Sequence, residues 1–216
     1  MAAIQRHSPV TFDAEPQKTE LRDNWNIVLA YDNEGPGPWL VDLSHKTRWD
    51  YQDSRLNDAP PSGLSVPVEP GGCHMAENRL INRMNGTQAS IWHLADAAPL
   101  PDSVAFTDVT EATVFLAILG SDTFRIAEKL TALDFSAPEK TTPFLLQGPF
   151  CHVPCQTVAL AYQPDLSGGL LLTCSRGYAE SMVDAILGSG SEFDLRPAGE
   201  NRFTDWLRLS REQDKS

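Results

Sequence analysis

The order of the strands and helices predicted in the C-terminal half of this chain limits its possible folds more than any other feature. Residues 112–120 form a short apolar run that ends in glycine, which predicts a buried strand. Residues 121–133 follow as a helix, with Ser121 as the expected N-cap. Apolar residues recur in that helix at helical spacing: Phe124, Ala127, Leu130 and Leu133.

Further strands and a second helix complete this half. Residues 157–163 and 168–174 are apolar or alternating, and they predict a hairpin. Residues 176–190 carry a helical pattern, and residues 192–197 return as a strand. The resulting order, β-α-β-β-α-β, is the split βαβ or ferredoxin-like pattern. The sequence therefore predicts an α+β fold.

The N-terminal half is predicted to be rich in strands. Residues 24–31 predict one strand, and residues 39–52 predict one long strand or two short ones. A hairpin is expected over residues 79–94. Asn85 and Gly86 would form its type I′ turn, because both residue types accept a positive φ.

These elements divide the chain into four segments. Residues 1–23 are polar and irregular, and we expect an N-terminal arm rather than a folded element. A β-rich subdomain spans residues 24–100 and contains a proline-rich surface linker at 57–72. The ferredoxin-like subdomain spans residues 101–200, and a C-terminal helix and tail occupy 201–216.

The C-terminal helix, predicted over residues 203–213, is amphipathic. Phe203, Trp206 and Leu207 share one of its faces. A helix this short needs a surface on which to pack that face. The chain's own domain is the favoured surface, and a partner subunit is the alternative.

Charge and targeting signals limit the possible partners and the compartment. The chain of 216 residues carries 17 basic and 29 acidic residues, a net charge of −12. Such a chain repels phosphate backbones, which argues against nucleic acid as a partner. No apolar run approaches the roughly 20 residues that span a bilayer, and the first residues lack the apolar core of a signal peptide. We therefore expect a cytoplasmic protein without a membrane partner.

The motif FCHVPCQ, residues 150–156, places Cys151, His152 and Cys155 close together. These are zinc-binding and redox-active residue types, and Cys73-His74 would be the distant second ligand pair. Residues i and i+4 in a strand lie about 13 Å apart at a rise of ~3.3 Å per residue, too far to share one metal. We therefore expect no metal, and reduced cysteines packed in or near a buried strand.

Other candidate sites carry weaker signals. Cys174 precedes Ser175 at a strand-to-helix turn, where a helix dipole lowers a thiol pKa, but the simpler interpretation is a strand end followed by a helix cap. The glycine-rich residues 187–193 follow a helix, whereas a phosphate-binding loop precedes one. Residues 41–50 gather charged side chains, most simply on a solvated strand face and alternatively in contact with an anionic ligand. Those side chains are Asp42, His45, Lys46, Arg48 and Asp50. We assign no catalytic or metal-binding residue, and the cofactor-binding residues stay unknown.

Several segments together resemble one protein family. Residues 107–136, TDVTEATVFLAILGSDTFRIAEKLTALDFS, are similar to the strand-helix unit of folate-linked aminomethyltransferases, the T-protein of glycine cleavage. Residues 194–203, DLRPAGENRF, and residues 41–50, VDLSHKTRWD, resemble two further T-protein segments. The chain resembles still more the gamma subunit of heterotetrameric sarcosine oxidase, through SRGYA at 175–179 and RHSP at 6–9. The resemblance implies a folate-binding-domain type of fold with ferredoxin-like halves.

The departures from that family bear on function. T-proteins carry an Asn-Asp acid after the first helix and an R-T-G-Y-T-G-E segment that handles folate, whereas residues 162–174 here read YQPDLSGGLLLTC. Arg202 falls near a family arginine only with a one-residue gap. The resemblance therefore implies a non-catalytic gamma-type subunit of an N-methyl amine demethylase, with flavin and tetrahydrofolate on larger partner subunits. A stand-alone folate-dependent transferase with a divergent pocket is the alternative, and a thiol- or metal-bearing redox protein is a third.

The five tryptophans, at positions 25, 39, 49, 92 and 206, supply a further argument for a partner. They exceed the needs of a modest core, and tryptophan is enriched at protein interfaces. We expect a permanent hetero-oligomeric interface of more than about 2,000 Å². It would involve the N-terminal arm and one of Trp25, Trp39 or Trp206.

Overall fold

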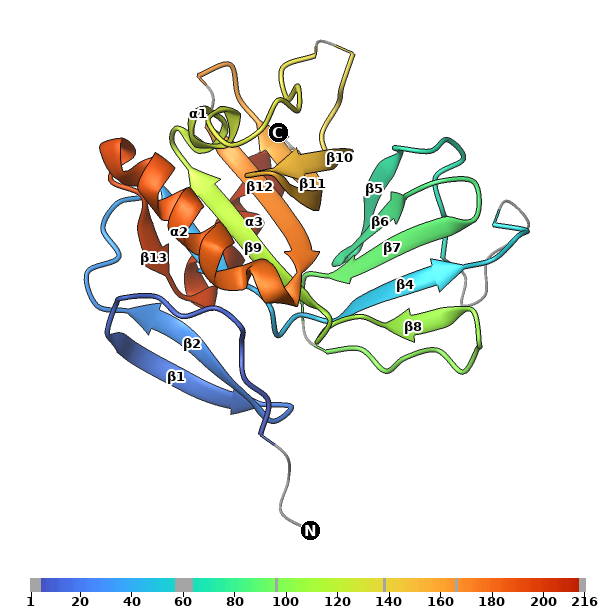
Figure 1. Ribbon diagram of the computed structural model, residues 1–216, viewed down its shortest axis with the longest axis horizontal. Helices are drawn as coiled ribbons and strands as arrows, with labels where there is room; N and C mark the ends of the chain where they lie inside the picture. The colour runs from blue at the N-terminus through green and yellow to red at the C-terminus, as the bar shows by residue number, and fades with distance from the viewer. Residues whose placement is uncertain (1–4, 57–63, 96, 138, 166, 214–216) are drawn as a thin grey trace.

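The structure is a computed structural model that describes residues 5–56, 64–95, 97–137, 139–165 and 167–213. Its strands form a six-stranded sheet, a five-stranded sheet and a two-stranded ribbon, with helices packed on the six-stranded sheet (Figure 1). The predicted α+β fold is confirmed. The first seven residues of the predicted linker, 57–63, lie outside the described residues.

The six-stranded sheet contains the predicted ferredoxin-like pattern. β9, β12 and β11 are neighbours in antiparallel pairs, and β13 lies at the far edge beyond β3. β3 therefore inserts between two strands of the pattern, and β10 adds a strand that the sequence pattern missed. In sheet order the strands are β10 (Phe144–Phe150), β11 (Val153–Tyr162), β12 (Gly168–Ser175), β9 (Thr113–Gly120), β3 (Trp39–Asp42) and β13 (Arg196–Ala198).

The helices of this half differ from their predicted bounds. α1 is Thr123–Glu128, shorter than residues 121–133, and its N-cap is Asp122 in the left-handed region rather than Ser121. The second helix is confirmed as a 3-10 turn, η2 (Arg176–Tyr178), followed by α2 (Ala179–Gly190). A further 3-10 turn, η3 (Ser191–Phe193), takes up the start of the predicted strand 192–197, so β13 begins only at Arg196.

The five-stranded sheet is antiparallel throughout and forms the bulk of the predicted β-rich half. The hairpin of β6 and β7 is confirmed, but its type I′ turn is wrong, since neither Asn85 nor Gly86 has a positive φ. The Asn85 side chain instead accepts the Thr87 N–H at 2.9 Å. The strands in order are β5 (Cys73–Ala76), β6 (Arg79–Arg83), β7 (Gln88–His93), β4 (Arg48–Gln52) and β8 (Phe106–Asp108).

The N-terminal segment is more ordered than predicted. β1 (Pro16–Arg22) pairs with β2 (Trp25–Tyr31) in an antiparallel ribbon, so the expectation of an irregular arm is wrong for these residues. The polar sequence of β1 hid the strand because nearly all its residues are exposed. Arg6 also bridges to Trp25, so the segment before the ribbon lies against β2.

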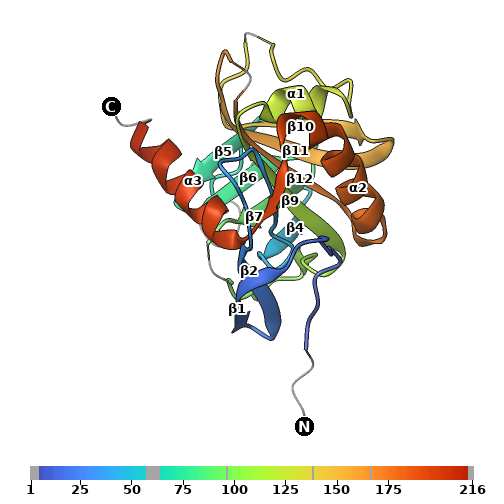
Figure 2. The same ribbon diagram turned by 90° about the vertical axis from the view of Figure 1, so that its left-hand side faces the viewer.

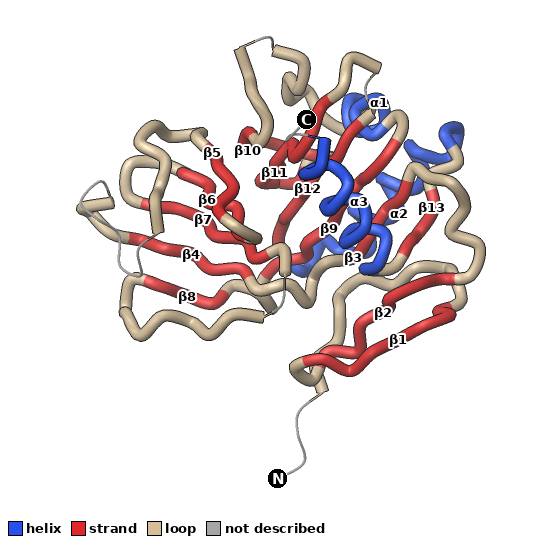
Figure 3. Tube along the Cα trace, turned by 180° about the vertical axis from the view of Figure 1, so that it is seen from behind, coloured by secondary structure: helices blue, strands red, loops and turns tan. Residues whose placement is uncertain are grey.

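The core forms layers on both faces of the six-stranded sheet. One face packs against α1 and α2 through residues such as Leu116, Phe124 and Ile186. The other face packs against the five-stranded sheet and α3 (Glu200–Gln213) through residues such as Phe115 and Trp92. Figures 2 and 3 show α3 lying on the opposite side of the sheet from α2.

The C-terminal helix packs on the chain's own domain, as favoured from the sequence. Phe203 and Leu207 are buried, and the Trp206 ring lies so close to Gly169 that a Cβ there would meet it at 2.2 Å. The tryptophan argument for an interface is wrong: Trp25, Trp49 and Trp92 are buried, and Trp39 and Trp206 are partly buried against the core. These side chains serve the chain's own packing.

Candidate functional site

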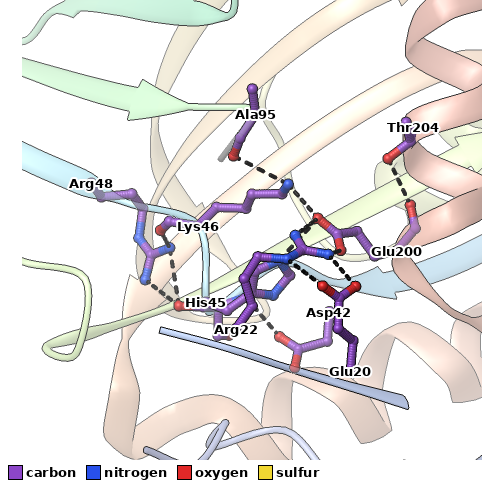
Figure 4. A network of polar contacts seen from close by, with 10 residues as sticks. Glu20, Arg22, Asp42, His45, Lys46, Arg48, Ala95, Glu200 and Thr204 are labelled. Carbon is purple, nitrogen blue, oxygen red and sulfur yellow. Dashed lines mark hydrogen bonds and ion pairs between the residues drawn. The ribbon is translucent and has the colours of Figure 1, made fainter. Parts of the chain in front are cut away.

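A buried carboxylate, Glu200 at the start of α3, collects three basic side chains (Figure 4). Arg22 of β1 approaches its Oε2 at 3.0 Å, and His45 Nε2 lies 3.1 Å from its Oε1. Lys46 Nζ also forms an ion pair with Glu200 and donates to the Ala95 carbonyl at 3.2 Å. The cluster thus joins the ribbon, the β3–β4 loop and α3.

These contacts set the protonation of Glu200. Burial by itself would raise the pKa of this carboxyl. The hydrogen bond from His45 and the positive charge of Lys46 outweigh burial and hold the pKa well below its ordinary value. Glu200 is therefore a carboxylate at neutral pH, with its charge matched by its neighbours, which suits it to hold structure rather than to transfer protons.

Asp42, at the end of β3, occupies a different environment. The Ser8 hydroxyl donates to its Oδ2 at 2.5 Å, and the Ser44 N–H donates to its Oδ1 at 2.9 Å. The Ser44 hydroxyl in turn accepts the Phe115 N–H at 3.2 Å, which ties the loop to β9. No residue of the described ranges forms an ion pair with Asp42.

Asp42 and His45 line a cavity of about 190 Å³ between the ribbon, the N-terminal segment and the β3–β4 loop. Burial, with the nearby charges of Asp42 and Glu34, raises the pKa of Tyr31 above its ordinary value, so its hydroxyl stays protonated. The remaining wall is formed by His7, Ser8, Val10, Trp25, Asn26, Ile27, Val28, Tyr31 and Ala198.

A second buried carboxylate, Glu34, fixes the segment that carries Arg202. Its Oε1 accepts the N–H groups of Tyr31 and Gly199, each at 2.9 Å, and its Oε2 accepts Arg202 Nε at 2.7 Å. The Arg202 guanidinium also lies 5.1 Å from the ring centre of Trp39. Arg202, the one arginine that the resemblance singled out, is thus held by the chain's own groups.

The charged segment 41–50 is not a solvated strand face, so that expectation is wrong. Lys46 and Arg48 are buried, at 4% and 1% exposure. The Arg48 guanidinium donates to the carbonyls of Lys46 and Thr110, each at 2.6 Å, and burial lowers its pKa to about 9. It remains charged at neutral pH and joins the two sheets.

The Cys/His motif adopts a turn rather than a strand. Cys151 and His152 are the two central residues of the β10–β11 hairpin, and both have a positive φ, as in a type I′ turn. Cys155 is buried in β11 and shares a hydrogen bond with Cys174 of β12, while Cys73 lies on β5 in the other sheet. No group of three or more metal-ligating residue types gathers within the described ranges. The absence of metal stays a prediction.

The other sequence candidates occupy structural positions. Cys174 is buried near the end of β12, and the Ser175 side chain makes no capping hydrogen bond to η2. Arg176 donates to the His7 carbonyl at 2.6 Å and fastens the N-terminal segment. Residues 187–193 end α2 and form η3.

Comparisons with known proteins identify the fold. No protein-family model matches this chain, and no curated protein sequence matches it. A chain of the heterotetrameric sarcosine oxidase from Corynebacterium sp. U-96 has a TM-score of 0.59 and 12% identity, and the match covers 71% of this chain and 84% of that one. The glycine cleavage system aminomethyltransferase T from Bartonella henselae also has a TM-score of 0.59, at 13% identity. That match covers 87% of this chain but only 57% of the aminomethyltransferase.

These similarities confirm the predicted fold, which this chain shares with both solved structures. At 12% and 13% identity they show the fold alone. Among the described residues no helix is long and apolar enough to cross a membrane.

Sequence reasoning missed the residues that organise the site: Ser8, Arg22, Glu34 and Glu200. Arg22 and Glu200 are 178 positions apart, so no local pattern links them. The one available signal was the quoted segment DLRPAGENRF, in which Glu200 follows Gly199 directly.

Proposed function

We propose that this chain is a non-catalytic, gamma-type subunit of a multisubunit oxidoreductase that demethylates an N-methyl amine. Flavin and tetrahydrofolate would be held by larger partner subunits. The observation that carries the proposal is the match to one chain of a heterotetrameric sarcosine oxidase across most of both chains. The match covers 71% of this chain and 84% of that one.

The chemistry of the two buried acids also favours a non-catalytic role for this chain. The buried acids Glu200 and Glu34 are satisfied by basic side chains and backbone N–H groups of the same chain. A general acid or base needs a poised proton in reach of a substrate. Neither buried acid offers one, since each is already engaged in holding secondary-structure elements together.

A stand-alone folate-dependent transferase is the second candidate, and the fold shared with aminomethyltransferase T favours it. This chain spans 57% of the length of that enzyme. It also lacks the folate-handling segment that the T-protein resemblance would require. We therefore rank the subunit role first.

Co-expression tests the proposal. The chain would be produced with any flavin amine oxidase-like and folate-domain-like proteins found to be encoded beside its gene, and the mixture separated by size exclusion. We expect one stable complex that contains this chain, with amine oxidation lower or absent when it is omitted. Elution of this chain alone, together with a fully active complex formed without it, would overturn the proposal.

A further inference from the structure

The cavity beside Asp42 is lined by a carboxylate that forms no ion pair with any of the described residues. Three cations of the surrounding segments already contact a carboxylate: Arg6 pairs with Glu111 at 2.7 Å, and Arg22 and Lys46 pair with Glu200. Asp42 accepts only a hydroxyl and a backbone N–H. A half-buried carboxylate without a paired cation favours binding of a positive charge.

Further basic side chains lie near Asp42, and His7 is one of those that line the cavity. His45 also lines the cavity, but its Nε2 is directed to Glu200 at 3.1 Å. Arg48 is buried and its hydrogen bonds go to backbone carbonyls and the Thr113 hydroxyl, so it acts on Asp42 only from a distance. The negative charge at the wall of the cavity therefore belongs to Asp42.

Part of the wall is suited to alkyl groups. Trp25, Ile27, Tyr31, Val10 and Ala198 supply apolar and aromatic surface, and the polar side chains of His7, Ser8 and Asn26 line the cavity beside them. Alkylated ammonium groups are recognised by a carboxylate together with aromatic surface. At about 190 Å³ the cavity is smaller than the roughly 300–1,000 Å³ of drug-sized ligand pockets, so it fits only a small molecule.

We propose that this cavity is a binding site for a small organic cation of the alkylammonium class, with Asp42 as its counter-charge. The cation's N–H would donate to an Asp42 oxygen, and its alkyl groups would pack against Trp25, Ile27 and Tyr31. The proposal goes beyond the subunit role, because it assigns a ligand to this chain itself and is tested on the purified full chain.

Three probes of similar size separate charge from shape. Trimethylammonium chloride, neutral tert-butanol and sodium acetate would each be titrated into the chain at constant ionic strength, with the Trp25 indole N–H signal followed by NMR. We expect trimethylammonium to bind with a dissociation constant on the order of 1 mM, which is within the limit for four non-hydrogen atoms. The other two probes should bind at least tenfold more weakly. Equal binding of tert-butanol, stronger binding of acetate, or no shift with trimethylammonium would overturn the proposal.

A matched pair of variants tests the role of Asp42. Asp42→Asn keeps the side-chain shape and an oxygen to accept the Ser44 N–H, and it should weaken trimethylammonium binding at least tenfold. The control, Asp50→Asn, removes a carboxylate that accepts Gln88 Nε2 at 2.7 Å in the five-stranded sheet, and it should bind the cation as the parent does. Unchanged binding by Asp42→Asn would contradict the proposal. The comparison of probes on the parent chain decides the matter even if Asp42→Asn does not fold.

Discussion

A single buried histidine makes the stability of this protein depend on pH. His93 lies at the end of β7, with its ring centre 4.3 Å from that of Trp49, and its Nε2 has no hydrogen-bond partner among the described residues. Burial, helped by the positive charge of Arg79, lowers the pKa of His93 to about 4. The folded state therefore keeps this ring neutral, while the unfolded chain binds a proton below pH ~6.5.

The free energy of unfolding therefore falls as the pH drops from ~6.5 to 4. His93 contributes about 3 kcal/mol to this fall. His93→Gln should remove most of that slope in urea unfolding measured between pH 7 and 5. Glu200 adds a separate loss, but only below pH ~4.5, because its pKa is lowered from an already acidic value. The control is His152→Asn in the exposed hairpin turn, where Asn tolerates the positive φ. If His93→Gln keeps the parent slope, the buried ring is not its source.

At the scale of elements, one glycine fixes how β2 meets the loop between β13 and α3. A Cβ on Gly199 would lie 2.2 Å from the Leu29 backbone carbon and 2.3 Å from its oxygen. The Gly199 N–H also donates to Glu34 at 2.9 Å, which holds this residue in place against β2. Backbone atoms cannot move aside as a flexible side chain can, so an added methyl must separate the two segments.

Gly199→Ala should therefore destabilise the chain by about 3 kcal/mol, the upper end of the usual cost of overpacking. Gly188→Ala is the matched control, because a Cβ there meets nothing within 4 Å. Alanine in the helix α2 should stabilise by roughly 0.5–1 kcal/mol. Urea unfolding of both variants gives the test, and a neutral Gly199→Ala would show that the segments part at no cost.

The elements found from the sequence are those whose own residues carry the pattern. β9 and β12 are continuous apolar runs because both faces of the six-stranded sheet are covered. The sequence pattern did not predict β1, because its residues are exposed and polar. It did not predict β10, because Gly148 and Pro149 interrupt the apolar run of that strand. The Glu200 cluster could not be predicted, since it forms only when the ribbon, the β3–β4 loop and α3 meet in the folded chain.

At the scale of the whole molecule, the five tryptophans give no support to the proposed subunit role. They pack inside the chain, so they do not mark a partner surface. Large apolar side chains do remain exposed, but they are scattered over separate elements: Leu21, Val68, Leu100, Val104, Tyr178 and Leu209. The subunit role therefore stays a proposal supported by the matched fold.

Folate binding by the isolated chain distinguishes the subunit role from the transferase alternative. Arg202 Nε donates to Glu34 at 2.7 Å and its guanidinium lies over the Trp39 ring, so this arginine already has a structural role within the chain. We expect that the isolated chain does not bind tetrahydrofolate with micromolar affinity and does not turn over a methylated amine. Calorimetry with tetrahydrofolate measures the first, and a formaldehyde assay with sarcosine measures the second. Micromolar binding that disappears in a folded Arg202→Ala variant would contradict the subunit role, because it would require a folate site built by this chain alone.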